Sequence, residues 1–253
     1  FLWGLPGVGK SELMQGVANK QTLGKTHLID VRVALMEPTD LRGMPYLDKE
    51  SNLMKWAPPV DLPSQELASQ YDTVILFLDE MNSAAPAVQA AGYQLTLNRR
   101  IGQYVLPDNV VIVAAGNRES DKGVTYRMPA PLANRFVHLE VRVDFDSWLN
   151  WAVENKQHED VVGYISFAKQ DLCDFDPRTS GRSFATPRSW SYVSDFLNDE
   201  TASNAELTDL ISGCVGEGVA IKFMAHRKIA KDMPKPAEIL AGKVKELKIK
   251  EIS

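Results

Sequence analysis

Cysteine is scarce in this sequence, and long apolar runs are missing from it. The 253 residues include two cysteines, Cys173 and Cys214, with neither C-x-x-C nor Cys/His ligand spacing. A disulfide framework and a structural zinc site are therefore poor interpretations, and a reducing compartment is favoured. No segment approaches the roughly 20 apolar residues that a membrane-spanning helix needs, and no secretory signal precedes the first motif. We expect a cytoplasmic protein without a membrane span.

A strong positive charge is also lacking over most of the chain. The net charge is −5, and the segment from Ile221 onward has nine Lys or Arg against four Asp or Glu, which leaves −10 on the remainder. This acidic body argues against binding to a nucleic-acid backbone as the main activity. An initiator methionine is missing too, because Phe1 leads almost directly into a motif. We expect further sequence upstream of it.

Apolar runs rich in β-forming residues alternate with stretches long enough for helices in the first part of the chain. This alternation favours a mostly parallel sheet with helices on its faces. After about Asp144 the strand signals stop and the periodicity becomes helical. The expected strands are 1–3, 26–33, 73–78, 110–114 and 136–143, and the expected later helices are 147–155, 187–197, 205–214 and 218–231.

Three regions follow from this pattern. We predict an α/β core with a five-stranded parallel sheet over 1–144, a smaller all-helical domain over 145–231 and a basic tail over 232–253. Residues 37–63 interrupt the core, because the five prolines of that segment break any simple crossover helix. We expect loops or a short hairpin there.

The clearest motif is a glycine-rich segment that ends in lysine and serine. It precedes a possible helix that begins near Glu12, and it follows the first expected strand. In the phosphate-binding loop that this pattern predicts, glycines let backbone N–H groups surround phosphates, lysine reaches the β- and γ-phosphates, and the hydroxyl binds Mg²⁺. A glycine-rich turn without a ligand is the alternative. The residues expected to bind the nucleotide are the motif residues Gly4, Leu5, Pro6, Gly7, Val8, Gly9, Lys10 and Ser11, together with Glu12.

Two adjacent carboxylates follow the buried strand expected at 73–78. Asp79 stands at the carboxyl end of this strand, where it can hold the Mg²⁺ that Ser11 also contacts, and Glu80 can orient and activate an attacking water. A hydrophobic strand that ends in Asp-Glu is common by itself. After a phosphate-binding loop, the pair indicates nucleotide hydrolysis.

With these motifs in this order, the sequence resembles the AAA+ ATPases, and two further segments fit. Asn117 follows the strand expected at 110–114, as the sensor 1 residue does, and is implied to help place the water. Arg135, within 131–136, resembles the arginine finger that reaches the nucleotide of the neighbouring subunit. A surface cation is the alternative for Arg135, and Arg127 and Arg118 compete for the same role.

Arg188 stands in a Thr-Pro-Arg-Ser segment of the second region and resembles the sensor 2 arginine. The resemblance implies that it contacts the γ-phosphate from a lid domain and couples the lid angle to the nucleotide state. Proline in the first helical turn is also ordinary helix chemistry, so a plain helix start is the alternative.

Within the superfamily, the sequence is most similar to MoxR-like ATPases, over about 1–197. This resemblance implies ATP and Mg²⁺ as ligands, a homo-oligomeric ring that is hexameric, and a chaperone-like or maturation role with partners that carry von Willebrand A domains. The residues that follow Asp79 and Glu80, and the residues that precede Arg99, differ from the pattern that is usual in MoxR-like ATPases. The matching segments are 37–43, 56–59, 80–82 and 97–100.

Three functions remain in competition. The leading one is ATP hydrolysis that drives remodelling of a partner protein. A nucleic-acid translocase or restriction-type motor predicts basic pore loops, but the segment 37–63 has three basic and five acidic residues. A nucleotide-dependent structural ring with little turnover would not need Glu80. Nucleic acid is therefore the less favoured partner.

Overall fold

The computed structural model describes residues 1–121, 125–178, 181–199 and 203–232. The chain divides into two compact units, Phe1–Arg142 and Val143–Ser253. The predicted basic tail falls almost entirely outside the described residues. Among the described residues, no helix combines the length and the apolarity needed to cross a membrane.

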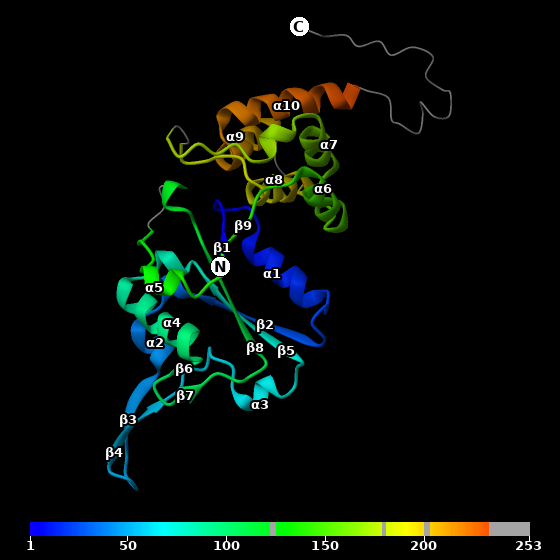
Figure 1. Cartoon of the computed structure of the whole chain (residues 1–253). Coiled ribbons are helices and arrows are strands. Elements are labelled where there is room, and N and C mark those ends of the chain that lie inside the picture. The colour runs from blue at the N-terminus through cyan, green and yellow to red at the C-terminus, as the bar shows by residue number, and fades with distance from the viewer. Residues whose placement is uncertain (122–124, 179–180, 200–202, 233–253) are drawn as a thin grey trace. The chain divides into compact units, whose positions relative to one another are not determined.

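A five-stranded sheet forms the centre of the first unit, and every pair of neighbouring strands in it is parallel (Figure 1). This confirms the predicted α/β fold with a five-stranded parallel sheet. In order across the sheet, the strands are β2 (Thr26–Arg32), β5 (Thr73–Asp79), β8 (Val110–Gly116), β1 (Leu2–Trp3) and β9 (Leu139–Glu140).

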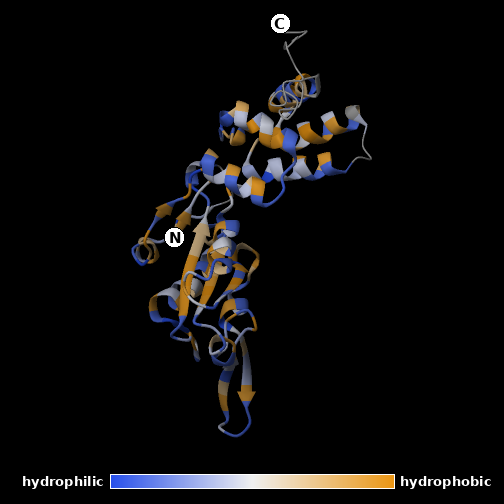
Figure 2. Cartoon of the chain, turned by 90° about the vertical axis from the view of Figure 1, so that its right-hand side faces the viewer, coloured by the Kyte–Doolittle hydropathy of each residue, from blue (hydrophilic) through white to orange (hydrophobic). Residues whose placement is uncertain are grey.

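Strand β5 lies between β2 and β8 and separates two apolar layers, because side chains alternate between the faces of a strand. Val74, Leu76 and Leu78 belong to one cluster, and Ile75 and Phe77 belong to the other. Helix α1 (Lys10–Asn19) covers the second cluster, whereas α2 (Pro38–Arg42), α3 (Gln65–Ala68), α4 (Pro86–Asn98) and α5 (Ala130–Ala133) contribute to the first. Hydrophobic residues accordingly concentrate on the central strands (Figure 2).

The last strand is shorter than the run predicted at 136–143. Leu2 of β1 pairs with Leu139 and Trp3 pairs with Glu140, and the chain turns at Gly4 directly after them. Leu139 is 56% exposed and Val137 is 77% exposed, as befits an edge. The predicted strand was therefore too long at both ends, since the pairing covers Leu139 and Glu140.

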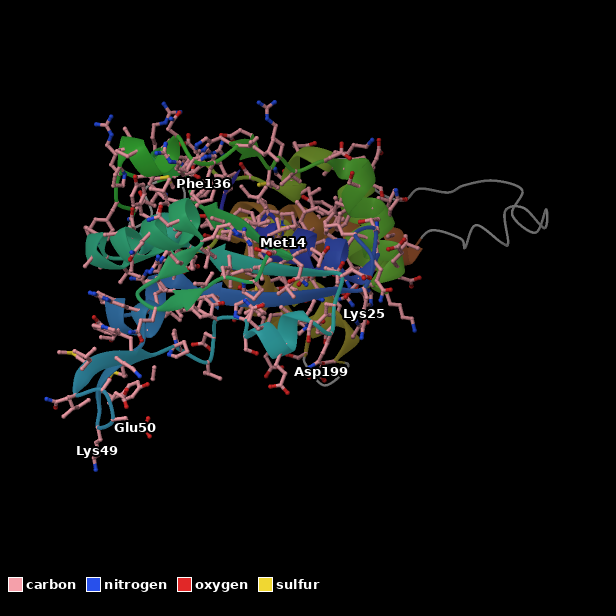
Figure 3. The ribbon with its side chains drawn as sticks, turned by 60° about the horizontal axis from the view of Figure 1, so that its bottom comes forward. Met14, Lys25, Lys49, Glu50, Phe136 and Asp199 are labelled. Atoms are coloured by element: carbon pink, nitrogen blue, oxygen red, sulfur yellow. The ribbon has the colours of Figure 1, made fainter. Side chains whose placement is uncertain are left out.

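The insertion at 37–63 contains the hairpin that was one of the two expected forms. Strands β3 (Met44–Asp48) and β4 (Leu53–Ala57) pair in antiparallel register, and Lys49 and Glu50 lie at the outer end, away from the sheet (Figure 3). Gly43 enters β3 with a φ of 90°, and a Cβ there would lie 2.0 Å from the Ala57 carbonyl oxygen. A second small hairpin, β6 (Arg100–Ile101) with β7 (Tyr104–Val105), was not predicted.

The second unit is helical, as predicted. Its core gathers around Tyr164, Trp190 and Phe223, whose rings pack against one another. Two buried side chains bond to Asp171: the Tyr164 hydroxyl donates to its carboxylate, and Trp190 Nε1 donates to its carbonyl oxygen at 2.9 Å. The helices are α6 (Phe145–Glu154), α7 (Glu159–Phe167), α8 (Pro187–Asn198), α9 (Asn204–Val215) and α10 (Glu217–Asp232). That this unit acts as a lid stays a prediction.

Candidate functional site

The glycine-rich segment forms a tight loop between β1 and α1. Gly4 is buried against Val141, where a Cβ would lie 3.0 Å from the Val141 carbonyl oxygen, and Gly9 has a φ of 89°, which favours glycine. Gly7 also has a positive φ, of 77°. Leu5, Pro6 and Val8 are half-buried, and Glu12 is exposed in the first turn of α1. The loop thus has the backbone freedom and the adjoining helix N-terminus that suit a phosphate group.

The Lys10 amine is held at the mouth of this loop. Its Nζ donates to the carbonyl oxygens of Gly4 and Leu5 at 2.9 and 3.0 Å and to Asn117 Oδ1 at 3.0 Å. The residue is 9% exposed. The three oxygen atoms fix the direction of a positive charge that can meet an anionic ligand.

Ser11 and Asp79 meet although they are far apart in the sequence. The Ser11 hydroxyl donates to Asp79 Oδ2 at 2.8 Å, while the Glu80 backbone N–H donates to Asp79 Oδ1 at 2.8 Å. Magnesium in proteins prefers oxygen ligands and is commonly held by one or two carboxylates together with phosphate oxygens. The donor set fits Mg²⁺, and Ser11 and Asp79 are the residues that could hold it.

Glu80 sits directly after β5 in a strained backbone conformation. Its φ of 54° is left-handed, and the 3₁₀ turn η2 (Met81–Ser83) begins after it. A non-glycine residue in this region costs about 1 kcal/mol or more and persists where the surroundings demand it. The side chain remains partly exposed, unlike that of Asp79, which is 6% exposed. A carboxylate in this place can accept a proton from water.

A further acidic group, Asp30, was missed by the sequence analysis. Burial raises the pKa of the Asp30 carboxyl, and the negative charge of Asp79 raises it further, whereas Arg32 opposes the shift. Asp30 lies on β2, two residues before Arg32, which is in register with Asp79. Only the parallel pairing of β2 with β5 brings these groups together, so no local pattern could reveal it.

Asn117 follows β8, as predicted, and the structure brings it to Lys10. A residue that the sequence analysis did not single out for a role, Asn82, holds its backbone: Asn82 Nδ2 donates to the Asn117 carbonyl oxygen at 2.7 Å, and the Asn117 N–H donates to Asn82 Oδ1 at 3.2 Å. The only signal in the sequence was an amide two residues after Glu80. Its partner, 35 positions away, could be identified only from the structure.

The three arginines proposed for action on a neighbouring subunit differ in their surroundings. Arg118 is engaged within its own chain, with Nε 3.4 Å from Asp121 Oδ2 and a second nitrogen 3.7 Å from Glu140 Oε2. Arg127 and Arg135 are exposed, and the described residues give neither side chain a hydrogen bond or an ion pair. Arg135 comes just after α5. The structure therefore leaves Arg135 and Arg127 available and Arg118 engaged.

Arg188 lies in the second unit, in the first turn of α8. Thr186 caps this helix by accepting a hydrogen bond from the Ser189 N–H at 3.1 Å, and Pro187 is its first residue. A cation near a helix N-terminus opposes the helix dipole, typically by about 0.3–1 kcal/mol. The Arg188 side chain is exposed. Helix stability therefore does not explain an arginine at this position.

Comparison with known proteins places this site in a family. Residues 1–142 match the model of the "ATPase family associated with various cellular activities (AAA)". No curated protein matches the sequence. The similar solved structures include the RuvB Holliday junction branch migration motor of Thermotoga maritima, at 18% identity and a TM-score of 0.44, and NtrX of Brucella abortus in complex with ADP, at 14% and 0.49.

The chain spans only part of these two proteins. The match with RuvB covers 90% of this chain and 61% of the RuvB chain. The match with NtrX covers 96% of this chain and 53% of the NtrX chain. At such identities and TM-scores, neither likeness bears on what this chain acts upon.

Proposed function

Because the chain belongs to the AAA family of ATPases, we propose that it binds ATP with Mg²⁺ and hydrolyses it at the loop between β1 and α1. One observation carries this proposal: Lys10, Ser11, Asp79, Glu80 and Asn117 converge at the carboxyl edge of the parallel sheet. Ligands of open α/β sheets bind at that edge. This edge therefore brings together a charge for phosphates, two oxygen ligands for a metal, a carboxylate that can act on water and a polar amide.

Each side chain has a distinct part in the proposed reaction. Lys10 and the backbone N–H groups of the loop bind the phosphates, and Ser11 and Asp79 hold the metal. Bound Mg²⁺ supplies positive charge that offsets the charge of the phosphates. Glu80 orients the attacking water and accepts its proton, while Asn117 fixes the position of that water.

We further propose that the active form is a homo-oligomeric ring, hexameric as in MoxR-like ATPases, and that Arg135 completes the site of the next subunit. Support comes from the exposure of Arg135 and from the engagement of Arg118 with Asp121 and Glu140. A guanidinium supplied in trans stabilises negative charge on the transferred phosphoryl group. Arg188 is proposed to sense the γ-phosphate from the helical unit.

Mixing two inactive variants tests this arrangement. Lys10→Ala and Arg135→Ala subunits should each hydrolyse ATP poorly, whereas an equal mixture should recover activity. About a quarter of its interfaces pair an intact Lys10 with an intact Arg135. Steady-state turnover across mixing ratios is the measurement. Arg127→Ala and Arg118→Ala, each measured alone, serve as controls that should keep their turnover, and a loss of turnover in Arg127→Ala that Lys10→Ala subunits restore would transfer the role to Arg127.

We propose that hydrolysis drives chaperone-like remodelling or maturation of a partner protein, in the manner of MoxR-like ATPases with their von Willebrand A domain partners. The hairpin β3–β4 supports a protein target. Leu47 pairs with Met54 across it, and these side chains are 62% and 66% exposed. Exposed apolar side chains of this kind mark contact with proteins more than with phosphate backbones.

Capture of the target tests the choice between protein and nucleic acid. The tagged full chain with Glu80→Gln, loaded with ATP, should retain a protein partner. The same protein with Leu47→Ser and Met54→Ser should retain about tenfold less, since two apolar contacts are lost. Mass spectrometry and nucleic-acid staining of one eluate give the answer. Recovery of nucleic acid alone would favour the translocase instead.

A further inference from the structure

Asn82 is a buried amide whose side chain bonds to both backbone groups of one distant residue. It is 1% exposed, and it meets the carbonyl oxygen and the N–H of Asn117 at 2.7 and 3.2 Å. An amide side chain offers one acceptor and two donors, so this two-point contact is the pairing that a neighbouring strand would otherwise provide. Asn82 thus acts as a short extension of the sheet.

The peptide of Asn117 needs such a partner because it lies beyond the ladder. Residue pairing of β8 with β5 ends at Ala114, and its pairing with β1 ends at Gly116. Buried backbone groups without partners cost free energy, and a backbone that is not held can rotate. Asn82 supplies the bonds where the strands no longer do.

Gly116 makes room for this contact. A Cβ at this position would lie 2.2 Å from Asn82 Oδ1 and 2.8 Å from Asn82 Cγ. Neither atom could stay in place beside a side chain at residue 116. The contact made by the Asn82 side chain therefore requires glycine at residue 116.

The contact links three parts of the proposed site. Asn82 follows Glu80 by two residues, and Asn117 Oδ1 accepts from Lys10 Nζ at 3.0 Å. The carbonyl oxygen of Asn82 accepts from the Tyr126 N–H at 2.7 Å, next to the exposed Arg127. A shift of Asn82 would move Asn117 relative to both the glutamate and the lysine.

We propose that Asn82 is a positioning residue for ATP hydrolysis, which acts through Asn117 and sets the rate of the reaction more than the affinity for ATP. This inference rests on the proposed ATPase function. Its side chain is buried and bonds to the Asn117 backbone, so it works by holding the Asn117 amide in the place where that amide accepts from Lys10. Small displacements of groups that place a reacting water are costly, about a hundredfold for an ångström.

The first test is Asn82→Ala in the full chain. We expect kcat to fall about ten- to a hundredfold, while the Kd for ATP in Mg²⁺ stays within about threefold. Asn109→Ala is the matched control. Asn109 Nδ2 also bonds two backbone carbonyl oxygens, of Ala68 and Tyr71 at 2.9 and 3.0 Å, but it precedes β8 at the opposite end of the strand. That variant should lose thermal stability and keep its kcat.

A double-mutant cycle separates positioning from mere stability. Gly116→Ala alone should displace Asn82 and lower both Tm and kcat. Asn82→Ala combined with Gly116→Ala removes the clash, so Tm should return to that of Asn82→Ala or above, while kcat stays low. If kcat rises together with Tm, Asn82 is only structural and the inference fails.

The two hypotheses fail in different ways. If Glu80→Gln abolishes hydrolysis but Asn82→Ala retains full kcat, the proposed function stands and the positioning role falls. If the unaltered chain neither binds nor hydrolyses ATP, both fall together. An equal loss of kcat in Asn109→Ala and Asn82→Ala would also overturn the positioning role.

Discussion

Glu80→Gln should lower the rate of ATP hydrolysis by about 10²–10⁴-fold, the range that general-base catalysis contributes. Glutamine keeps the size of the side chain and the backbone conformation at φ 54°, but its amide cannot accept a proton from water. Asp79 keeps its bond from Ser11 at 2.8 Å, so the metal ligands are untouched. Affinity for ATP should therefore stay within a few-fold of that of the parent, which single-turnover and equilibrium-binding measurements can separate.

Glu66→Gln is a suitable control for this experiment. Glu66 lies exposed in the first turn of α3, and the loss of its charge should leave turnover unchanged. Unchanged turnover in Glu80→Gln would remove Glu80 from the proposed reaction. A parallel loss of ATP binding would instead assign it to the binding of the nucleotide.

Lys10→Ala should weaken ATP binding by about ten- to a hundredfold, because a charged hydrogen bond contributes about 1.5–3 kcal/mol. The lost amine also leaves the carbonyl oxygens of Gly4 and Leu5 without their donor. Isothermal titration with Mg·ATP and with ADP measures the effect. The parent should gain about 2.7 kcal/mol of stability at an ATP concentration of 100 Kd, and the variant should show a much smaller thermal shift at that concentration.

Two further variants sharpen the Lys10 experiment. Lys20→Ala removes an exposed lysine at the end of the same helix and should bind ATP as the parent does. Lys10→Arg keeps the charge but replaces a compact ammonium with a broad, planar fork. Because Lys10 is buried between three oxygen atoms, arginine should not restore binding. Full affinity in Lys10→Ala would contradict the proposed phosphate site.

The elements with a local signal could be predicted from the sequence. The glycine-rich loop follows β1, two carboxylates follow the β5 run, and Asn117 follows β8, so the three strand ends that carry the site were found. Helix α7 was not among the predicted helices, and its β-branched residues Val161, Val162 and Ile165 have a lower helix propensity than leucine or alanine. In the structure His158 caps the helix, because its side chain accepts from the Asp160 N–H at 3.1 Å, and the helix buries Val161, Tyr164 and Ile165. Tertiary packing overrode propensity there.

The contacts within the site could not be predicted from the sequence, for a different reason. Asp30 approaches Asp79 only because β2 is the neighbour of β5, and Asn82 reaches Asn117 only because both strands end at one edge. Strand order is a global property that local patterns do not encode. The choice among arginines depended likewise on the bonds that Arg118 makes to Asp121 and Glu140.

The left-handed backbone of Glu80 has a consequence for anyone who engineers this protein. Glycine and asparagine adopt that conformation at less cost than glutamate does, so either residue at position 80 should raise the melting temperature while removing the carboxylate. A library selected only for heat resistance would therefore enrich inactive proteins at this position. Thermal stability and turnover must be scored together, because at Glu80 the fold and the reaction favour different amino acids.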